Sequence, residues 1–207
     1  MTAPASYPGL NLLDSDDAAN NETEVMVFGF WVFLMSDLVM FGLFFATYVT
    51  MSDNLAFGPG PRQLFDLASV GWQTACLLVS SFAMGMGSLA LKYDGARSRQ
   101  LLMWLGVAGV LAAAFLFLEL RDFSHMATLG GVPSRSGFLS AYYGLVGLHG
   151  VHITFGLLWL AFMMTKIAAT PPDHPVKTQV LRLALYWHFL GLVWVGIFSV
   201  VFLTGVA

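Results

Sequence analysis

The sequence predicts an all-α membrane protein folded as a bundle of five transmembrane helices. The chain has 207 residues, of which 57% are hydrophobic and only 10% are charged. Soluble domains carry roughly 25% charged residues. In addition, the apolar runs exceed the roughly 18 residues that indicate a membrane-spanning helix. A net charge of −3 argues against nucleic acid as a partner, and a single cysteine, Cys76, cannot form an internal disulfide.

Residues 1–23 are predicted to form a poorly ordered tail, and residues 24–207 a single membrane domain. The tail contains no lysine or arginine, so it lacks the basic region of a cleavable signal peptide. It is instead acidic and rich in polar residues, which favours disorder. Its acidic residues are Asp14, Asp16, Asp17 and Glu22.

Five apolar segments follow the tail, and each can cross a hydrocarbon core that needs about 20 helical residues. They cover residues 24–51, 67–92, 98–121, 138–166 and 176–203. Glycine and proline interrupt the pattern in the connections, for example in the Gly-Pro-Gly-Pro run at 58–61 and in the Pro-Pro pair at 171–172. Neither a repeat nor a second domain is predicted.

The basic residues predict an orientation. With five spans, six lysines and arginines flank the spans on the side of the amino terminus, and three lie on the opposite side. Because basic residues accumulate in cytoplasmic loops, we expect a cytoplasmic amino terminus and a periplasmic carboxyl terminus.

Five ionisable side chains lie inside the apolar segments and are the candidate functional residues. They are Asp37, Glu119, His149, His152 and His188. A charged acid at mid-membrane costs about 2.5–3.5 kcal/mol on insertion scales, so such residues are expected to face protein or a polar cavity. We expect them to form an internal polar network, with Glu119 within reach of a histidine of the last two spans.

Two other interpretations of these residues stay open. His188 with His149 or His152 could ligate a haem iron, although a bis-histidine di-haem protein needs four well-placed histidines and the spans hold three. Asp37 and Glu119 could belong to a proton relay or a small transporter, although such a path needs several groups in line. A zinc-protease motif is ruled out because Gly150 stands where that motif has glutamate.

Several segments, taken in order, resemble subunit III of the haem–copper respiratory oxidases, most of all its cytochrome o ubiquinol oxidase form. The likeness covers about residues 27–203. The segments that carry it are 28–37 (Phe-Gly-Phe-Trp-Val-Phe-Leu-Met-Ser-Asp), 43–48 (Leu-Phe-Phe-Ala-Thr-Tyr), 132–159 with its His-Gly-Val-His at 149–152, and 186–194, which opens Tyr-Trp-His-Phe-Leu. Glu119 also matches a carboxylate of the family.

Two positions qualify the resemblance. The resemblance implies an acid shortly after the Trp-His-Phe motif, where this chain has Gly191, so this chain lacks the side chain for any role of that acid. Asp37 occupies a position where quinol-type relatives carry aspartate and mitochondrial-type relatives carry glutamate. This residue favours the quinol branch.

The resemblance implies an accessory subunit without haem, copper or an active site of its own, in the inner membrane of a bacterium. Haem and copper are expected in subunit I, its main partner, with subunits II and IV in the same complex. Phospholipids are expected in clefts between the helices. The expected function is to support assembly, lipid binding and proton delivery to subunit I in an enzyme that couples quinol oxidation to oxygen reduction and proton translocation. A subunit of a cytochrome c oxidase is the alternative.

Overall fold

The computed structural model describes residues 17–56, 58–90, 98–169 and 174–206, and it contains the five long helices that the sequence predicts. These are α1 (Asp17–Met51), α3 (Leu67–Ala90), α4 (Ser98–Thr128), α5 (Gly137–Ala169) and α6 (His174–Ile197). All five contain a segment long and apolar enough to cross a membrane. The backbone donors and acceptors of such segments must be satisfied within the helix, because lipid offers none. The predicted fold class is thus confirmed.

The remaining elements are short. Helix α2 (Pro61–Leu64) lies between α1 and α3, and the 3₁₀ turn η1 (Pro133–Arg135) lies between α4 and α5. After α6 the chain continues through a π-helical stretch, η2 (Phe198–Leu203), into the final turn α7 (Thr204–Val206). The Tyr48 hydroxyl of α1 donates a hydrogen bond to the Val201 carbonyl of η2 at 3.4 Å, which joins the ends of the first and last spans.

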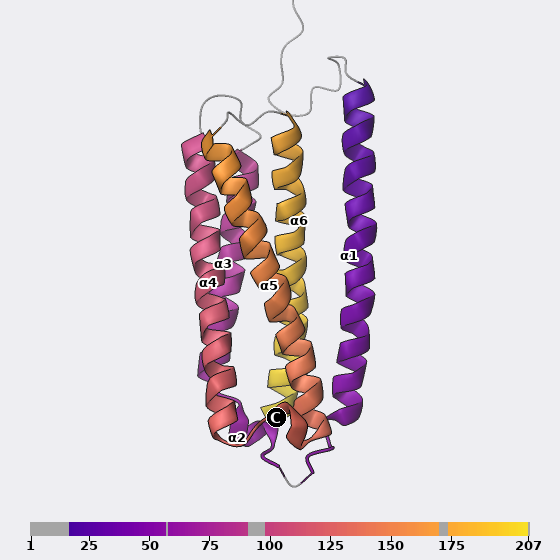
Figure 1. The fold of residues 1–207 in the computed structure, drawn as a ribbon, viewed down its shortest axis with the longest axis vertical. Helices are drawn as coiled ribbons and strands as arrows, with labels where there is room; N and C mark the ends of the chain where they lie inside the picture. Colours follow the sequence, from indigo (N-terminus) through magenta and orange to yellow (C-terminus); the bar gives the residue numbers. More distant parts are fainter. Residues whose placement is uncertain (1–16, 57, 91–97, 170–173, 207) are drawn as a thin grey trace, which may run out of the picture.

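The long helices stand side by side and alternate in direction along the chain (Figure 1). Helices α3 and α4 form the most extensive pair, while α5 and α6 pack against each other and each touches one member of that pair. Helix α1 stands at one edge and packs against α5 and α6. It is the least buried of the five spans.

Two helix ends lie seven residues beyond the predicted boundaries, since α1 begins at 17 instead of 24 and α4 ends at 128 instead of 121. Helix α1 begins at Asp17, inside the segment predicted to be a poorly ordered tail, and α4 continues to Thr128, beyond the predicted end of its span at residue 121. Hydropathy detects the apolar part of a helix, whereas the helix itself extends further with polar turns. The prediction for residues 1–16 lies outside the described residues.

Local sequence signals explain where other helices begin and end. The Asp66 carboxylate accepts a hydrogen bond from the Ala68 amide at 3.0 Å, which caps the start of α3. After α4, Gly130 adopts φ +79°, and its amide bonds to the Ala127 carbonyl while the Gly131 amide bonds to the Met126 carbonyl. This is a Schellman motif, which needs a left-handed residue that glycine supplies without strain.

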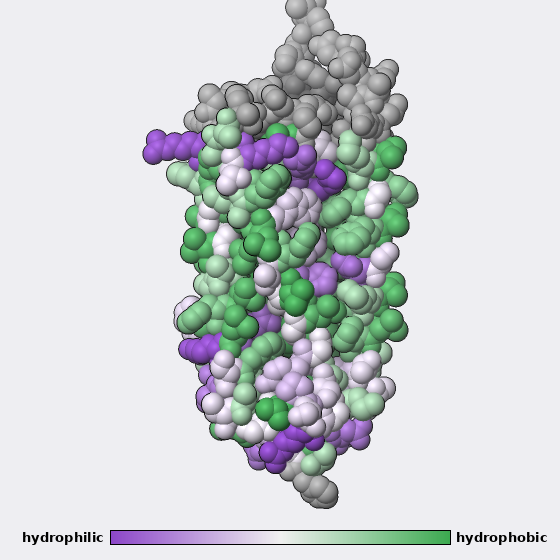
Figure 2. Space-filling view, in the orientation of Figure 1, coloured by the Kyte–Doolittle hydropathy of each residue, from purple (hydrophilic) through white to green (hydrophobic). Residues whose placement is uncertain are grey.

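The interior of the bundle is filled by large aromatic residues, among which Trp187, Trp194 and Tyr142 are almost completely buried. The outer surface is a hydrophobic belt, and hydrophilic residues gather mainly toward the two ends (Figure 2). Helix α1 contributes much of the exposed apolar surface, including Phe28, Val39 and Leu43. Such a surface requires lipid or neighbouring protein around it.

Candidate functional site

Asp37 and His152 form a polar contact between α1 and α5. The Asp37 Oδ2 atom lies 3.6 Å from His152 Nε2, and both side chains are mostly buried. His152 Nδ1 donates to the Leu148 carbonyl at 2.8 Å, so this nitrogen already carries a hydrogen. The 3.6 Å separation between Oδ2 and Nε2 exceeds the usual range of a hydrogen bond, and no described residue hydrogen-bonds to Oδ2. The contact is therefore a close approach of an acidic and a basic side chain that brings α1 against α5.

His149 connects α5 to α6. Its imidazole is completely buried, and Nε2 donates to the Leu190 carbonyl at 3.2 Å. The ring centroid lies 5.1 Å from that of Trp194 and 5.6 Å from that of Phe115. His149 therefore belongs to the aromatic packing between three helices.

Glu119 reaches α5 without bonding to a histidine. Only 3% of the residue is exposed, and neither carboxyl oxygen has a hydrogen-bond partner among the described residues. The carboxyl group lies against Gly150, where a built Cβ atom would be 2.9 Å from Oε1. Glu119 thus reaches α5, as expected, at Gly150, the residue that follows His149. The contact is with the glycine, and no hydrogen bond between Glu119 and a histidine is found among the described residues.

His188 differs from the other candidates because it is exposed on the surface of the chain. Its Nδ1 atom lies 2.7 Å from the Ser81 hydroxyl of α3. Two further side-chain bonds join α3 and α6. Trp187 Nε1 donates to Ser80 at 2.9 Å, and Trp194 Nε1 donates to Thr74 at 3.0 Å. Together these bonds form a polar ladder between antiparallel helices.

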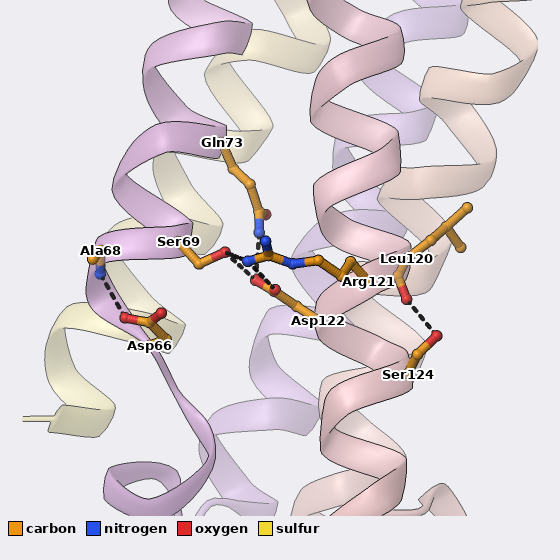
Figure 3. A network of polar contacts seen from close by, with 8 residues as sticks. All are labelled: Asp66, Ala68, Ser69, Gln73, Leu120, Arg121, Asp122 and Ser124. Carbon is orange, nitrogen blue, oxygen red and sulfur yellow. Dashed lines mark hydrogen bonds and ion pairs between the residues drawn. The ribbon is translucent and has the colours of Figure 1, made fainter.

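A second polar cluster lies toward one end of α3 and α4 and was missed by the sequence analysis (Figure 3). The Asp122 Oδ2 atom accepts hydrogen bonds from the Ser69 hydroxyl and from Gln73 Nε2, each at 2.7 Å. Arg121 donates to Ser69 at 3.2 Å and lies 3.4 Å from Asp122 Oδ1. The cluster ties the start of α3 to the last turns of α4.

The chain is similar to curated proteins over most of its length, although no family model matches it. It is 42% identical over 189 residues to the cytochrome bo(3) ubiquinol oxidase subunit 3 of Pseudomonas aeruginosa, and the aligned region covers 91% of this chain and 90% of that protein. The corresponding protein of Pseudomonas putida is 41% identical, with 88% and 87% covered. The cytochrome c oxidase subunit 3 of Bacillus sp. (strain PS3) is 38% identical, with 86% and 84% covered. The chain belongs to the terminal oxidase subunit 3 family.

This oxidase subunit 3 is a multi-pass membrane protein, and its membership of a family of oxidase subunits implies a complex with other oxidase chains. The five candidate residues do not make one connected network within the described ranges. Asp37 contacts His152, His149 and His188 bond to other groups, and no described residue hydrogen-bonds to either carboxyl oxygen of Glu119. In the part of the subunit that the structure describes, no group of three or more His, Cys, Asp or Glu residues is placed to hold a metal ion.

Gly191, at the position where the resemblance implies an acid, lies beside the Ser81–His188 bond. A built Cβ atom at Gly191 would be 3.7 Å from the Ser81 hydroxyl and 3.9 Å from Ser81 Cβ, which is ordinary contact. A side chain at this position would therefore point toward Ser81. In this oxidase subunit 3, His188 is the hydrogen-bond partner of that hydroxyl.

The sequence contains features from which the Asp122 cluster could have been predicted. Ser69 and Gln73 are four residues apart at the start of a span, so they share a helix face. Asp122 follows the predicted end of the next span, and consecutive antiparallel helices bring these ends together. The predicted span ends at residue 121 because hydropathy falls there, whereas the helix continues through Asp122 to Thr128.

Replacing Asp122 with alanine is expected to weaken the α3–α4 contact. Hydrogen bonds to a charged group contribute about 1.5–3 kcal/mol, and two donors would lose their acceptor. We expect a lower denaturation temperature of this subunit in the purified complex, with Asp122→Asn intermediate. Asp53→Ala is the matched control, because it removes the same side chain from an exposed position outside the cluster. Equal stability of Asp122→Ala and Asp53→Ala would contradict a structural role for the cluster.

Proposed function

We propose that this chain is the cofactor-free accessory subunit of a proton-translocating quinol oxidase in the cytoplasmic membrane of a bacterium. Haem and copper belong to subunit I, its main contact, and subunits II and IV complete the enzyme. The chain supports assembly and proton delivery to subunit I. Its amino terminus is cytoplasmic and its carboxyl terminus periplasmic, in line with the six-to-three distribution of basic residues.

The observation that carries this proposal is how the intramembrane histidines are used. His149 and His188 each give one ring nitrogen to a bond between helices, and His152 bonds within α5 while facing Asp37. An imidazole engaged in this way orients helices. The quinol assignment is supported by the Pseudomonas relatives, which are named as ubiquinol oxidase subunits.

Bound phospholipid fits the surface beside α1. A groove of about 520 Å³ is lined by Phe45, Ala46, Val49, Thr50, Gly196 and Val200. It lies between α1 and α6, and its lining is almost entirely apolar, as an acyl chain requires. We propose that a lipid chain occupies it and supports the weakly packed α1.

Mild extraction of the membrane complex tests the assignment. We expect this chain to copurify with larger subunits that carry the haem spectrum, and the complex to oxidise a quinol. Oxidation of reduced cytochrome c instead of quinol would favour the alternative, a cytochrome c oxidase, which the Bacillus relative supports. A haem band that remains with this chain after it is separated from the other subunits would overturn the accessory role.

Replacing His149 and His152 together with alanine is expected to shorten the active lifetime of the oxidase complex and to leave its initial rate of turnover nearly unchanged. The double variant loses the Leu190 bond and the Asp37 contact, which hold α5 to α6 and α1. Initial turnover per haem should stay near the wild-type value, while the half-life of activity during turnover falls several-fold and less complex assembles. Immediate loss of all turnover in an intact complex would count against the proposal.

A further inference from the structure

His188 presents an unusual polar group on the outside of the bundle. It lies near the middle of the last span, and it is exposed in the isolated chain, unlike the buried His149. Lipid tails at this depth offer no hydrogen-bond partner, and an unsatisfied polar group there is costly. Intramembrane ionisable residues therefore face protein or a polar cavity in nearly all cases. The exposure of His188 indicates a surface that another protein covers.

The contact with Ser81 favours one tautomer of the His188 ring. Other hydroxyls on the same helix donate to backbone carbonyls, as Thr74 does to Val70 and Ser88 does to Gly85. For the Ser81 hydroxyl, the described residues offer a single acceptor, His188 Nδ1 at 2.7 Å. If Ser81 donates to Nδ1, the neutral ring must carry its hydrogen on Nε2. The imidazole then presents an N–H donor.

The surroundings of the ring suit the approach of another helix. Gly85 lies beside the ring, where a built Cβ atom would be 3.7 Å from His188 Cε1. On α6, Leu192 and Val195 follow at spacings of four and seven residues, so they share the face of His188, and they are 65% and 43% exposed. Small residues let helices come close, and exposed aliphatic side chains supply packing.

We propose that this face of α3 and α6 docks a transmembrane helix of another oxidase subunit, and that the helix presents an oxygen acceptor to the Nε2–H group of His188. The acceptor is a carboxyl, amide or hydroxyl side chain at the same depth. The partner is a protein because neither lipid tails nor the described residues of this chain supply an acceptor for Nε2. The inference rests on the proposed function, since it requires an oxidase complex.

Substitution of His188 in the whole complex tests the hydrogen bond. Glutamine can place an N–H donor near the position of Nε2, whereas leucine cannot donate. Interhelical hydrogen bonds in membranes average about 0.6 and reach about 1.7 kcal/mol, which corresponds to roughly 3- to 20-fold in affinity. In graded detergent washes, we expect the His188→Leu subunit to dissociate from the complex roughly 3- to 20-fold more readily than the wild-type subunit. The measured quantity is the amount of this subunit that remains per haem. His188→Gln should be retained nearly as wild type.

Two controls separate docking from folding. Ser81→Ala removes the internal bond and keeps the imidazole, so its loss from the complex should be smaller than that of His188→Leu. Equal retention of His188→Leu and His188→Gln would overturn the docking inference while leaving the proposed function intact. Failure of the unaltered chain to copurify with haem-bearing subunits would instead overturn the proposed function.

Cross-linking identifies the occupant independently of stability. A cysteine at position 192, introduced as Leu192→Cys in a Cys76→Ala background, would carry a thiol-attached photoreactive group within the assembled complex. We expect an adduct with another oxidase subunit, at a membrane-spanning peptide identified by mass spectrometry. An adduct with a second copy of this chain, or with lipid alone, would overturn the proposal.

Discussion

Trp187→Ala is expected to lower the free energy of unfolding by about 3–5 kcal/mol, the range for removing a buried aromatic side chain. Trp187 is 2% exposed. Its indole N–H donates to Ser80, whose hydroxyl donates in turn to the Ala108 carbonyl of α4 at 2.8 Å. The ring also packs against Gly156, where a built Cβ atom would be 3.4 Å from Trp187 Cζ3. One side chain therefore joins α6 to α3 and α5, and through Ser80 to α4.

The measurement is the denaturation midpoint of the subunit in a titration from mild to denaturing detergent. Trp187→Phe keeps most of the ring and loses the N–H donor, so it should cost about 1 kcal/mol for the hydrogen bond plus a share of the packing. Trp72→Ala is the matched control, because Trp72 is 70% exposed. A Trp187→Ala variant no less stable than Trp72→Ala would show that the bundle does not depend on this contact.

Gly150→Ala is the second substitution for which we expect a large effect, of about 1–3 kcal/mol of destabilisation from overpacking. The new methyl group would lie 2.9 Å from Glu119 Oε1, 3.1 Å from Oε2 and 3.2 Å from the carboxyl carbon. Glu119 is buried, so its carboxyl group has little room to move. The substitution must separate α4 from α5 or force the Glu119 side chain into another rotamer.

Gly147→Ala on the same helix provides the control, because a built Cβ atom there meets nothing within 4 Å. Alanine favours a helix over glycine by about 1 kcal/mol, so Gly147→Ala should be neutral or stabilising. Glu119→Ala should relieve the crowding, so that adding Gly150→Ala costs less in that background than in the wild type. Additive effects of the two substitutions would contradict direct contact between Glu119 and position 150.

The number and place of the helices followed from the sequence because a membrane imposes a minimum apolar length on each span. The ends were less predictable. Helix α1 starts in residues that we expected to be disordered, and α4 passes the point at which hydropathy falls. A helix that leaves the apolar layer continues with polar residues, and hydropathy cannot separate such a turn from a loop.

The partners of the polar residues were predicted only in part. The spacing of His149 and His152 places them on one face of a helix, and about 60° of rotation separates them at 3.6 residues per turn. That angle is enough to direct His149 to α6 and His152 to α1. Nothing in the local pattern selects these neighbours, because spans that are apolar on all sides show no distinct buried face.

The sequence alone determined the class of the protein, its five spans and the residues whose polarity demands partners, since each of these depends on composition along one segment. The tertiary structure alone decided that Glu119 lies against Gly150, that Asp122 joins α3 to α4, and that His188 remains on the outside. Those outcomes depend on the rotation and pairing of helices, which are set by side-chain packing between segments far apart in the chain.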